Sequence, residues 1–171
     1  MTRRVYTVDT IGNAVLGATA AQLDAITNVG ARVVTSSSTA LSLTATQHAE
    51  RVVIWSPNAA STNIATLPAA TGSGARYEIR NGIAQTQGTI NIASASAGDI
   101  FKGIAYAFDT TAAADAGAFL STATSVKVTM NKTTTGGLGH DKLVAIDAAL
   151  NEWRVEFYFT ASGTIATPFS A

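Results

Sequence analysis

The stretch WRVEFYF at residues 153–159 alternates large apolar side chains with polar ones. Successive side chains of a β-strand point to opposite faces, so the apolar set shares one face and Arg154, Glu156 and Tyr158 share the other. We expect the apolar face to meet a buried core and the polar face to meet water or a neighbour. Full burial of each core side chain contributes on the order of 1.5–3 kcal/mol. The predicted core residues, with one from an earlier run, are Trp55, Trp153, Val155, Phe157 and Phe159.

Eight further runs alternate in the same way or concentrate β-branched and aromatic residues, with turn-forming residues between them. They lie at residues 41–44, 52–55, 64–67, 76–80, 89–92, 100–108, 126–130 and 143–146. Short strands at spacings of roughly 8–15 residues are typical of all-β domains. The sequence therefore predicts an all-β body, either an antiparallel β-sandwich or a β-barrel.

The connections between these runs carry their own signals. Asn81-Gly82 lies between alternating runs and predicts a tight β-hairpin, because both central positions of that turn favour a positive φ. Residues 149–152 predict a second hairpin that joins the last two strands. The alanine-rich segment 109–124 has little β-branching, and its pattern leaves a long loop and a short helix as open alternatives.

The first 38 residues lack the two-residue period of the rest of the chain. Residues 5–8 indicate a short extended piece, and residues 19–27 indicate one short helix with Thr19 as its N-cap. Residues 36–38, three serines, indicate a linker. We therefore predict an extended N-terminal arm at 1–38, containing at most a short helix and binding a neighbouring surface, either its own body or another protein, and a β-sandwich or barrel body at 39–171.

Composition excludes several classes of function. The 171 residues include 11 basic and 11 acidic side chains, and this balance argues against a protein that neutralises nucleic-acid phosphates. The chain has no cysteine for disulfides or thiolate metal sites, and no run approaches the roughly 20 apolar residues of a membrane span. Charged residues are only 13% of the chain, while alanine and threonine are abundant. This composition favours a structural role over a catalytic one.

Residues that could support chemistry are few and scattered. His48 is expected in a solvated turn, and His140 in a loop beside Asp141. The acidic residues are expected on exposed loops, because no spacing brings two of them together. The glycine-rich stretch 136–142 lacks the Gly-Lys-Ser/Thr ending of a phosphate loop and predicts a hairpin connection instead. The sequence thus predicts no catalytic, cofactor-binding or metal-binding residue, no enzymatic activity, and no small-molecule ligand.

Three stretches resemble structural proteins of tailed bacteriophages and prophages. They are residues 66–79 (TLPAATGSGARYEI), 133–137 (TTTGG) and 163–170 (GTIATPFS), and with the strands between them the resemblance spans about residues 40–171. Their motifs are turns and strand edges rather than catalytic signatures. The chain resembles the capsid decoration proteins, also called cement or head-stabilising proteins.

This resemblance implies a homotrimer on the outer surface of an icosahedral capsid, bound to the major capsid protein and made in the host bacterial cytoplasm. It also implies attachment through the N-terminal arm, which would add a strand to the capsid protein. The arm residues expected to contact the capsid are Arg3, Arg4, Val5, Tyr6 and Val8.

A second interpretation is a tail-associated or fibre protein with a receptor- or glycan-binding β-domain. Glycan binding uses exposed aromatic rings, and the candidates on outward strand positions are Tyr106 and Tyr158. An enzyme with a β-sandwich fold lacks any converging set of acid, base and nucleophile in this sequence.

Overall fold

The structure, a computed structural model, describes residues 7–8, 14–15, 32–111 and 115–171. The chain divides into two units, Met1–Arg32 and Val33–Ala171. In the first unit, β1 (Thr7–Val8) pairs antiparallel with β2 (Ala14–Val15). We call the second unit the body.

The body begins ahead of the boundary predicted at residue 39. Its first strand, β3 (Val33–Ser36), pairs in parallel with β5 (Val52–Trp55), so Ser36 belongs to a sheet and not to a linker. The carbonyl oxygen of Ser38 accepts a hydrogen bond from the indole Nε1 of Trp55 at 2.7 Å. The prediction of a serine linker was therefore wrong, because this segment is hydrogen-bonded into the body.

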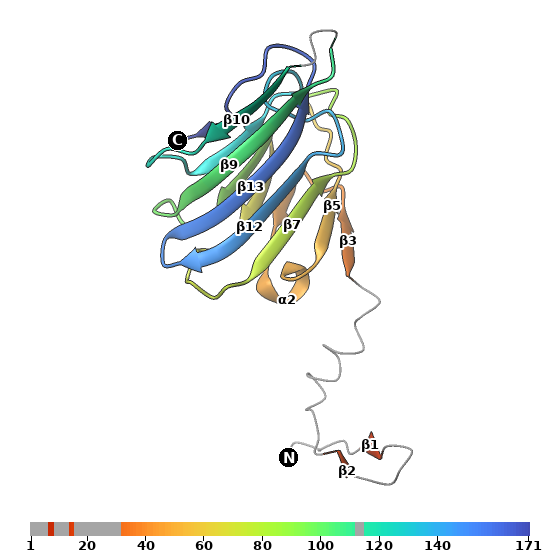
Figure 1. Cartoon of the computed structure of the whole chain (residues 1–171). Coiled ribbons are helices and arrows are strands. Elements are labelled where there is room, and N and C mark those ends of the chain that lie inside the picture. Colours follow the sequence, from red (N-terminus) through yellow and green to blue (C-terminus); the bar gives the residue numbers. More distant parts are fainter. Residues whose placement is uncertain (1–6, 9–13, 16–31, 112–114) are drawn as a thin grey trace. The chain divides into compact units, whose positions relative to one another are not determined.

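The larger sheet has seven strands, which Figure 1 shows side by side. Their order is β10 (Ala116–Leu120), β9 (Ile100–Asp109), β13 (Glu152–Ala161), β12 (Lys142–Ala149), β7 (Arg76–Asn81), β5, β3. The second sheet has five strands, in the order β14 (Phe169–Ser170), β11 (Lys127–Met130), β8 (Ile90–Ser94), β6 (Asn63–Leu67), β4 (Ala40–Ser42). A one-turn helix, α2 (Ala45–His48), connects β4 to β5.

Successive strands from β3 to β9 alternate between the two sheets. Strands that neighbour each other within a sheet, such as β5 and β7 or β6 and β8, are therefore two elements apart in sequence, and they run parallel. The ten-residue strands β13 and β9 also pair in parallel. The body is mostly β, as predicted, but its sheets are mixed rather than purely antiparallel. The barrel alternative was wrong, because each sheet ends in two edge strands.

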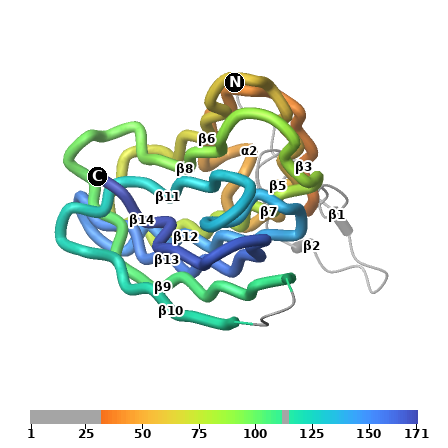
Figure 2. The backbone as a smooth tube through the Cα atoms, turned by 90° about the horizontal axis from the view of Figure 1, so that it is seen from above, coloured from red at the N-terminus to blue at the C-terminus, as the bar shows by residue number. Residues whose placement is uncertain are grey.

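Both sheets contribute to one buried core, and Figure 2 shows them as two layers. From the seven-stranded sheet, Trp153 meets Tyr77 edge-on at 5.7 Å between ring centroids, and Phe157 stacks with Phe159 at 5.1 Å. The five-stranded sheet contributes residues such as Ile92. Trp55, Trp153, Val155, Phe157 and Phe159 are all at most 2% exposed.

Of the connections predicted at 149–152, 81–82 and 109–124, the first was right and the other two were wrong. The hairpin at 149–152 is confirmed, because β12 and β13 pair antiparallel across it. Asn81-Gly82 does not form a hairpin, since the chain crosses there from β7 in one sheet to β8 in the other. Gly82 instead permits close packing, because a Cβ at that position would overlap the hydroxyl of Ser56. Segment 109–124 contains a strand, β10, which neither open alternative included.

Candidate functional site

The two histidines occupy different environments, and neither lies beside a catalytic partner among the described residues. His48 ends α2 and is buried, and its Nδ1 accepts a hydrogen bond from the Thr44 amide at 3.0 Å. Burial and the nearby charge of Arg51 lower the pKa of His48, which favours the neutral form of the ring that accepts this bond. The predicted solvated turn was wrong for His48. His140 is exposed in a loop, with a φ of 63°.

Four carboxylates are buried, although exposed loops were predicted for the acidic residues. They are Glu78, Asp99, Asp141 and Asp147. Each accepts hydrogen bonds that compensate for lost hydration. Asp99, for example, accepts bonds from the Ala70 amide at 2.7 Å and from the Ser94 hydroxyl. Asp99, Asp141 and Asp147 bind loop residues in this way, whereas Glu78 contacts two arginines of its own strand.

Asp141 anchors the glycine-rich loop. Its carboxylate accepts hydrogen bonds from the amides of Gly137 at 2.5 Å and Thr160 at 2.9 Å. Burial raises the pKa of Asp141, although these hydrogen bonds oppose the rise. The loop crosses from β11 in one sheet to β12 in the other, so the predicted hairpin connection at 136–142 was wrong.

Asp147 holds the turn at residues 71–73, which lies within the stretch that resembles phage structural proteins. It accepts five hydrogen bonds of 2.6–3.0 Å: from the amides of Thr71, Gly72 and Ser73 and from the hydroxyls of Thr71 and Ser73. Burial alone would raise the pKa of Asp147, but these donors outweigh it and lower the pKa to about 2. Asp147 therefore acts as a structural anchor.

No arrangement for catalysis or metal binding emerges from the described part of the chain. Within it, no three His, Asp or Glu side chains gather where they could hold a metal ion. Asp141 precedes the first residue of β12 and Asp147 lies near its other end, so they do not form a carboxylate pair. The remaining candidate site lies on an exposed surface.

The outer face of the seven-stranded sheet, opposite the core, carries an ordered arrangement of side chains. Strand pairing aligns it in three rows across β10, β9, β13, β12 and β7. The basic row contains Lys102, Arg154, Ile146 and Arg76; the apolar row contains Leu120, Ile104 and Val144 together with the carboxylates Glu156 and Glu78; the tyrosine row contains Ala118, Tyr106, Tyr158, Lys142 and Arg80. Apolar side chains thus lie between two rows that contain cations.

Two carboxylates on this face each contact two cations. Glu152 lies 2.5 Å from Lys102 Nζ and 2.7 Å from Arg154 Nε. Glu78 lies 2.6 Å from Arg76 and 2.7 Å from Arg80. Each group of three therefore keeps one unmatched positive charge. The partial burial of Glu78 would raise its pKa, but the two arginines outweigh that effect and lower the pKa.

The two tyrosines proposed for glycan binding lie together on this face. Tyr106 and Tyr158 stack with centroids 5.1 Å apart, and Lys142 Nζ lies 4.6 Å from the Tyr158 ring centroid. Tyr106 and Lys142 come from strands on opposite sides of β13, so they cover the two faces of the Tyr158 ring. Sugar stacking needs a free aromatic face, and Tyr158 offers none in this arrangement.

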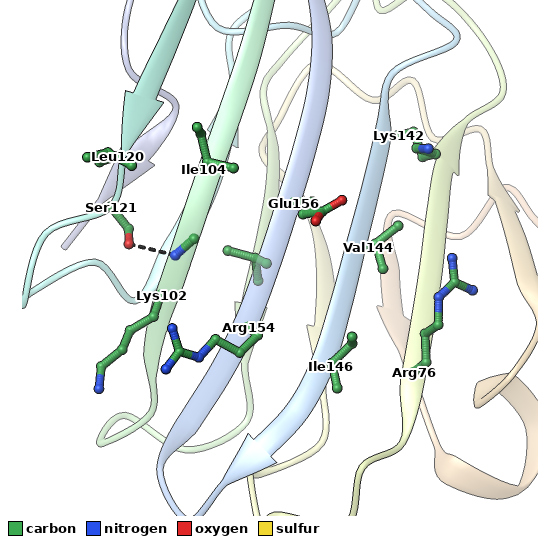
Figure 3. Close-up of a pocket in the computed structure, with 12 residues that line it drawn as sticks. Arg76, Lys102, Ile104, Leu120, Ser121, Lys142, Val144, Ile146, Arg154 and Glu156 are labelled. Carbon is green, nitrogen blue, oxygen red and sulfur yellow. Dashed lines mark hydrogen bonds between the residues drawn. The ribbon is translucent and has the colours of Figure 1, made fainter.

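The apolar row forms the floor of an open groove of about 880 Å³ (Figure 3). Figure 3 shows Lys102, Arg154 and Arg76 along one side of this floor and Lys142 toward the other. At the β10 end, the Gly103 amide donates a hydrogen bond to Ser121 Oγ at 2.9 Å. A side chain at position 103 would overlap the carbonyl oxygen of Val155, so glycine is required where β9 approaches β13.

Sequence reasoning placed Arg154, Glu156 and Tyr158 on an outward face but did not find the groove. The missing residues, Lys102 and Lys142 among them, lie on strands that are far apart in the sequence. Lys102 was visible only as a polar position in the run 100–108, and Lys142 only as the last residue of the glycine-rich stretch 136–142. Their convergence depends on strand order and register, which a single strand's pattern does not contain.

Only part of the predicted capsid-binding arm can be located. Val8 lies in β1, while Arg3, Arg4, Val5 and Tyr6 lie outside the described residues, as does the helix predicted at 19–27. No helix in the described segments is both long enough and apolar enough to span a lipid bilayer. The chain matches no family model, no curated protein and no solved structure.

Proposed function

We propose that this protein is a structural virion component that binds the outer surface of a tailed-phage capsid as a trimer and stabilises the shell. Its partner is the major capsid protein, and the host bacterial cytoplasm is where it is made. The body then serves as a rigid β-sandwich that covers part of the shell. No enzymatic step is part of this proposal.

The observation that carries the proposal is the open outer face of the seven-stranded sheet. It exposes apolar side chains, including Leu120 at 74% and Ile146 at 38%, beside cations that are only partly neutralised. Such a face suits a broad contact with another protein, since burying it removes apolar area from water. The resemblance of residues 66–79, 133–137 and 163–170 to phage structural proteins directs the proposal to a capsid.

The N-terminal unit supplies a second contact in this proposal. β1 pairs with β2 through two residues, Thr7 with Val15 and Val8 with Ala14. A two-stranded pair leaves an outer edge on each strand, and a capsid strand can add to such an edge through main-chain hydrogen bonds. Three arms per trimer would multiply weak contacts by avidity.

Co-sedimentation tests the capsid assignment. The purified full-length chain is mixed with DNA-free heads, and separately with isolated tails, of the phage that carries its gene, and each mixture is centrifuged through a sucrose cushion. We expect the protein to pellet with heads in multiples of three and to raise their temperature of thermal disruption. Binding to tails alone would contradict the capsid assignment and favour the tail-associated interpretation.

A truncation tests the contribution of the arm. Deletion of residues 1–12 removes β1 and leaves the body, whose strands begin at Val33. We expect an unchanged thermal unfolding transition of the body and loss of co-sedimentation with heads. If the truncated chain binds heads as the full chain does, the arm is not the attachment element.

A further inference from the structure

The groove on the outer face combines an apolar floor with basic sides. Leu120, Ile104 and Val144 lie in one row that crosses four strands, with Glu156 of β13 between Ile104 and Val144, and Leu120 is 74% exposed. Adjacent strands are about 4.8 Å apart, so this floor extends across the strands for roughly 14 Å. A ligand that covers it must present apolar groups to Leu120, Ile104 and Val144 and leave room for the Glu156 side chain between the last two.

The two sides of the groove are spaced to receive a peptide segment. Lys102 and Arg154 lie on one side of the floor and Lys142 on the other, and the two rows are four residues apart along each strand. Four residues of a strand span about 13 Å, close to the 10–12 Å diameter of an α-helix with its side chains. A helix lying across the strands can place its apolar face on the floor and its flanks beside the cations.

The charge of the face selects the chemistry of that segment. Each of Glu152 and Glu78 is shared between two cations, which leaves one surplus positive charge at β9 and β13 and another at β7, both on the same outer face. Within the groove, Glu156 is the one acidic side chain in the lining, against four basic ones. Carboxylates that flank an apolar stripe would match this surplus.

We propose that the groove binds an acidic amphipathic segment of a partner protein. A nucleic acid would satisfy the cations but leave the apolar floor uncovered, and Tyr158 has no free ring face for a base. A second copy of the same face would bring two surplus positive charges together. Binding of such a segment involves the groove alone and does not require the partner to be a capsid protein.

A synthetic helix is a direct probe of this binding. The probe is a fluorescein-labelled 18-residue peptide of leucine, glutamate and alanine, with leucines at i, i+3, i+4 and i+7 and glutamates on both flanks. Its binding to the full-length chain is followed by fluorescence anisotropy, beside a peptide with lysine in place of glutamate and a single-stranded DNA of 18 nucleotides. We expect the acidic peptide to bind at least about tenfold more tightly than either, and to weaken as salt rises from about 50 mM to about 300 mM.

Variants locate the binding to the groove. The double variant Lys142→Gln/Arg154→Gln removes one cation from each side, and we expect it to weaken binding of the acidic peptide at least about fivefold. Leu120→Ser tests the floor of the groove. The Leu120 side chain is 74% exposed, so the fold of the protein does not depend on it. The matched control is Lys127→Gln on β11 of the other sheet, which we expect to leave binding unchanged.

Several results would overturn the proposal. They are absence of binding by the acidic peptide, equal binding of the lysine peptide, tighter binding of DNA, or equal effects of the groove variants and Lys127→Gln. Thermal unfolding of every variant confirms that it is folded. The peptide experiment contains no capsid. Its failure would therefore contradict the groove proposal without contradicting co-sedimentation of the protein with heads.

Discussion

The two faces of the seven-stranded sheet carry different kinds of side chain, although the same strands form both. On the inner face, Trp153 and Phe157 are fully buried. On the outer face, their sequence neighbours Arg154 and Glu156 are exposed and line an open groove. The inner face stabilises the fold. The side chains of the outer face are exposed and contribute little to that stability, so they are available for binding.

The outer face of the five-stranded sheet differs again. Its row of Ser42, Thr66, Ala93 and Ser170 contains a single cation, Lys127. Charged side chains are therefore unevenly distributed between the two sheets, and they are concentrated on the outer face of the larger one. This difference makes Lys127 a suitable control position for charge substitutions.

The largest difference in the free energy of unfolding is expected between two adjacent substitutions, one on each face. Trp153→Ala empties a fully buried site and should lower the free energy of unfolding by about 3–5 kcal/mol. Arg154→Ala, one residue later on the outer face, should lower it by no more than about 1 kcal/mol. Denaturant unfolding of both variants measures the difference, and similar losses would mean that the two faces are not distinct in stability.

The next effect concerns the buried anchor Asp147, on the inner side of β12. Its pKa is lowered from 3.8 to about 2 in the folded state, so its stabilisation is complete only above about pH 5 and is lost progressively as pH falls to about 2 and below. That lowering corresponds to about 2 kcal/mol of stability. Asp147→Asn should lose a similar amount at pH 7 and show a correspondingly smaller further loss in acid.

Denaturant unfolding between pH 7 and pH 2 tests this anchor. The control is Asp115→Asn, which replaces an exposed carboxylate and should keep the acid dependence of the unsubstituted protein. If Asp147→Asn and the unsubstituted protein lost the same stability between pH 4 and pH 2, the five hydrogen bonds would not hold the carboxylate in its charged form.

The smallest effect is expected on the outer face itself. Lys142→Gln removes the cation beside the Tyr158 ring and should change the free energy of unfolding by about 0.5–1 kcal/mol or less. Denaturant unfolding measures this change, and the same variant serves in the peptide-binding experiment. A loss of several kcal/mol would show that the tyrosine row stabilises the body rather than remaining free for binding.

The sequence predicted the elements whose signal is local. Alternation in residues 153–159 identified β13 and its buried face, and the turn at 149–152 identified its antiparallel partner β12. The strand at 100–108 was predicted and is β9, but its parallel pairing with β13 was not, because that pairing joins residues about 50 positions apart. Such pairing depends on the path of the chain between the two sheets rather than on any single run.

The features that the sequence did not predict share this cause. β10 contains alanine and glycine and has weak strand propensity, but pairing with β9 makes it a strand. The buried carboxylate of Asp147 was expected on an exposed loop because its donors, at residues 71–73, are distant in sequence. The groove was missed for the same reason, since its cations converge only when β9, β12, β13 and β7 are aligned.

Electron cryo-microscopy of the virion tests the central claim most directly, namely that this protein acts by lying against a neighbouring protein through its outer face. The account predicts density for residues 33–171 on the outer surface of the capsid, with a segment of another chain covering the groove of Leu120, Ile104 and Val144. Density for the body with this groove open to solvent, or particles that lack the protein altogether, would contradict it.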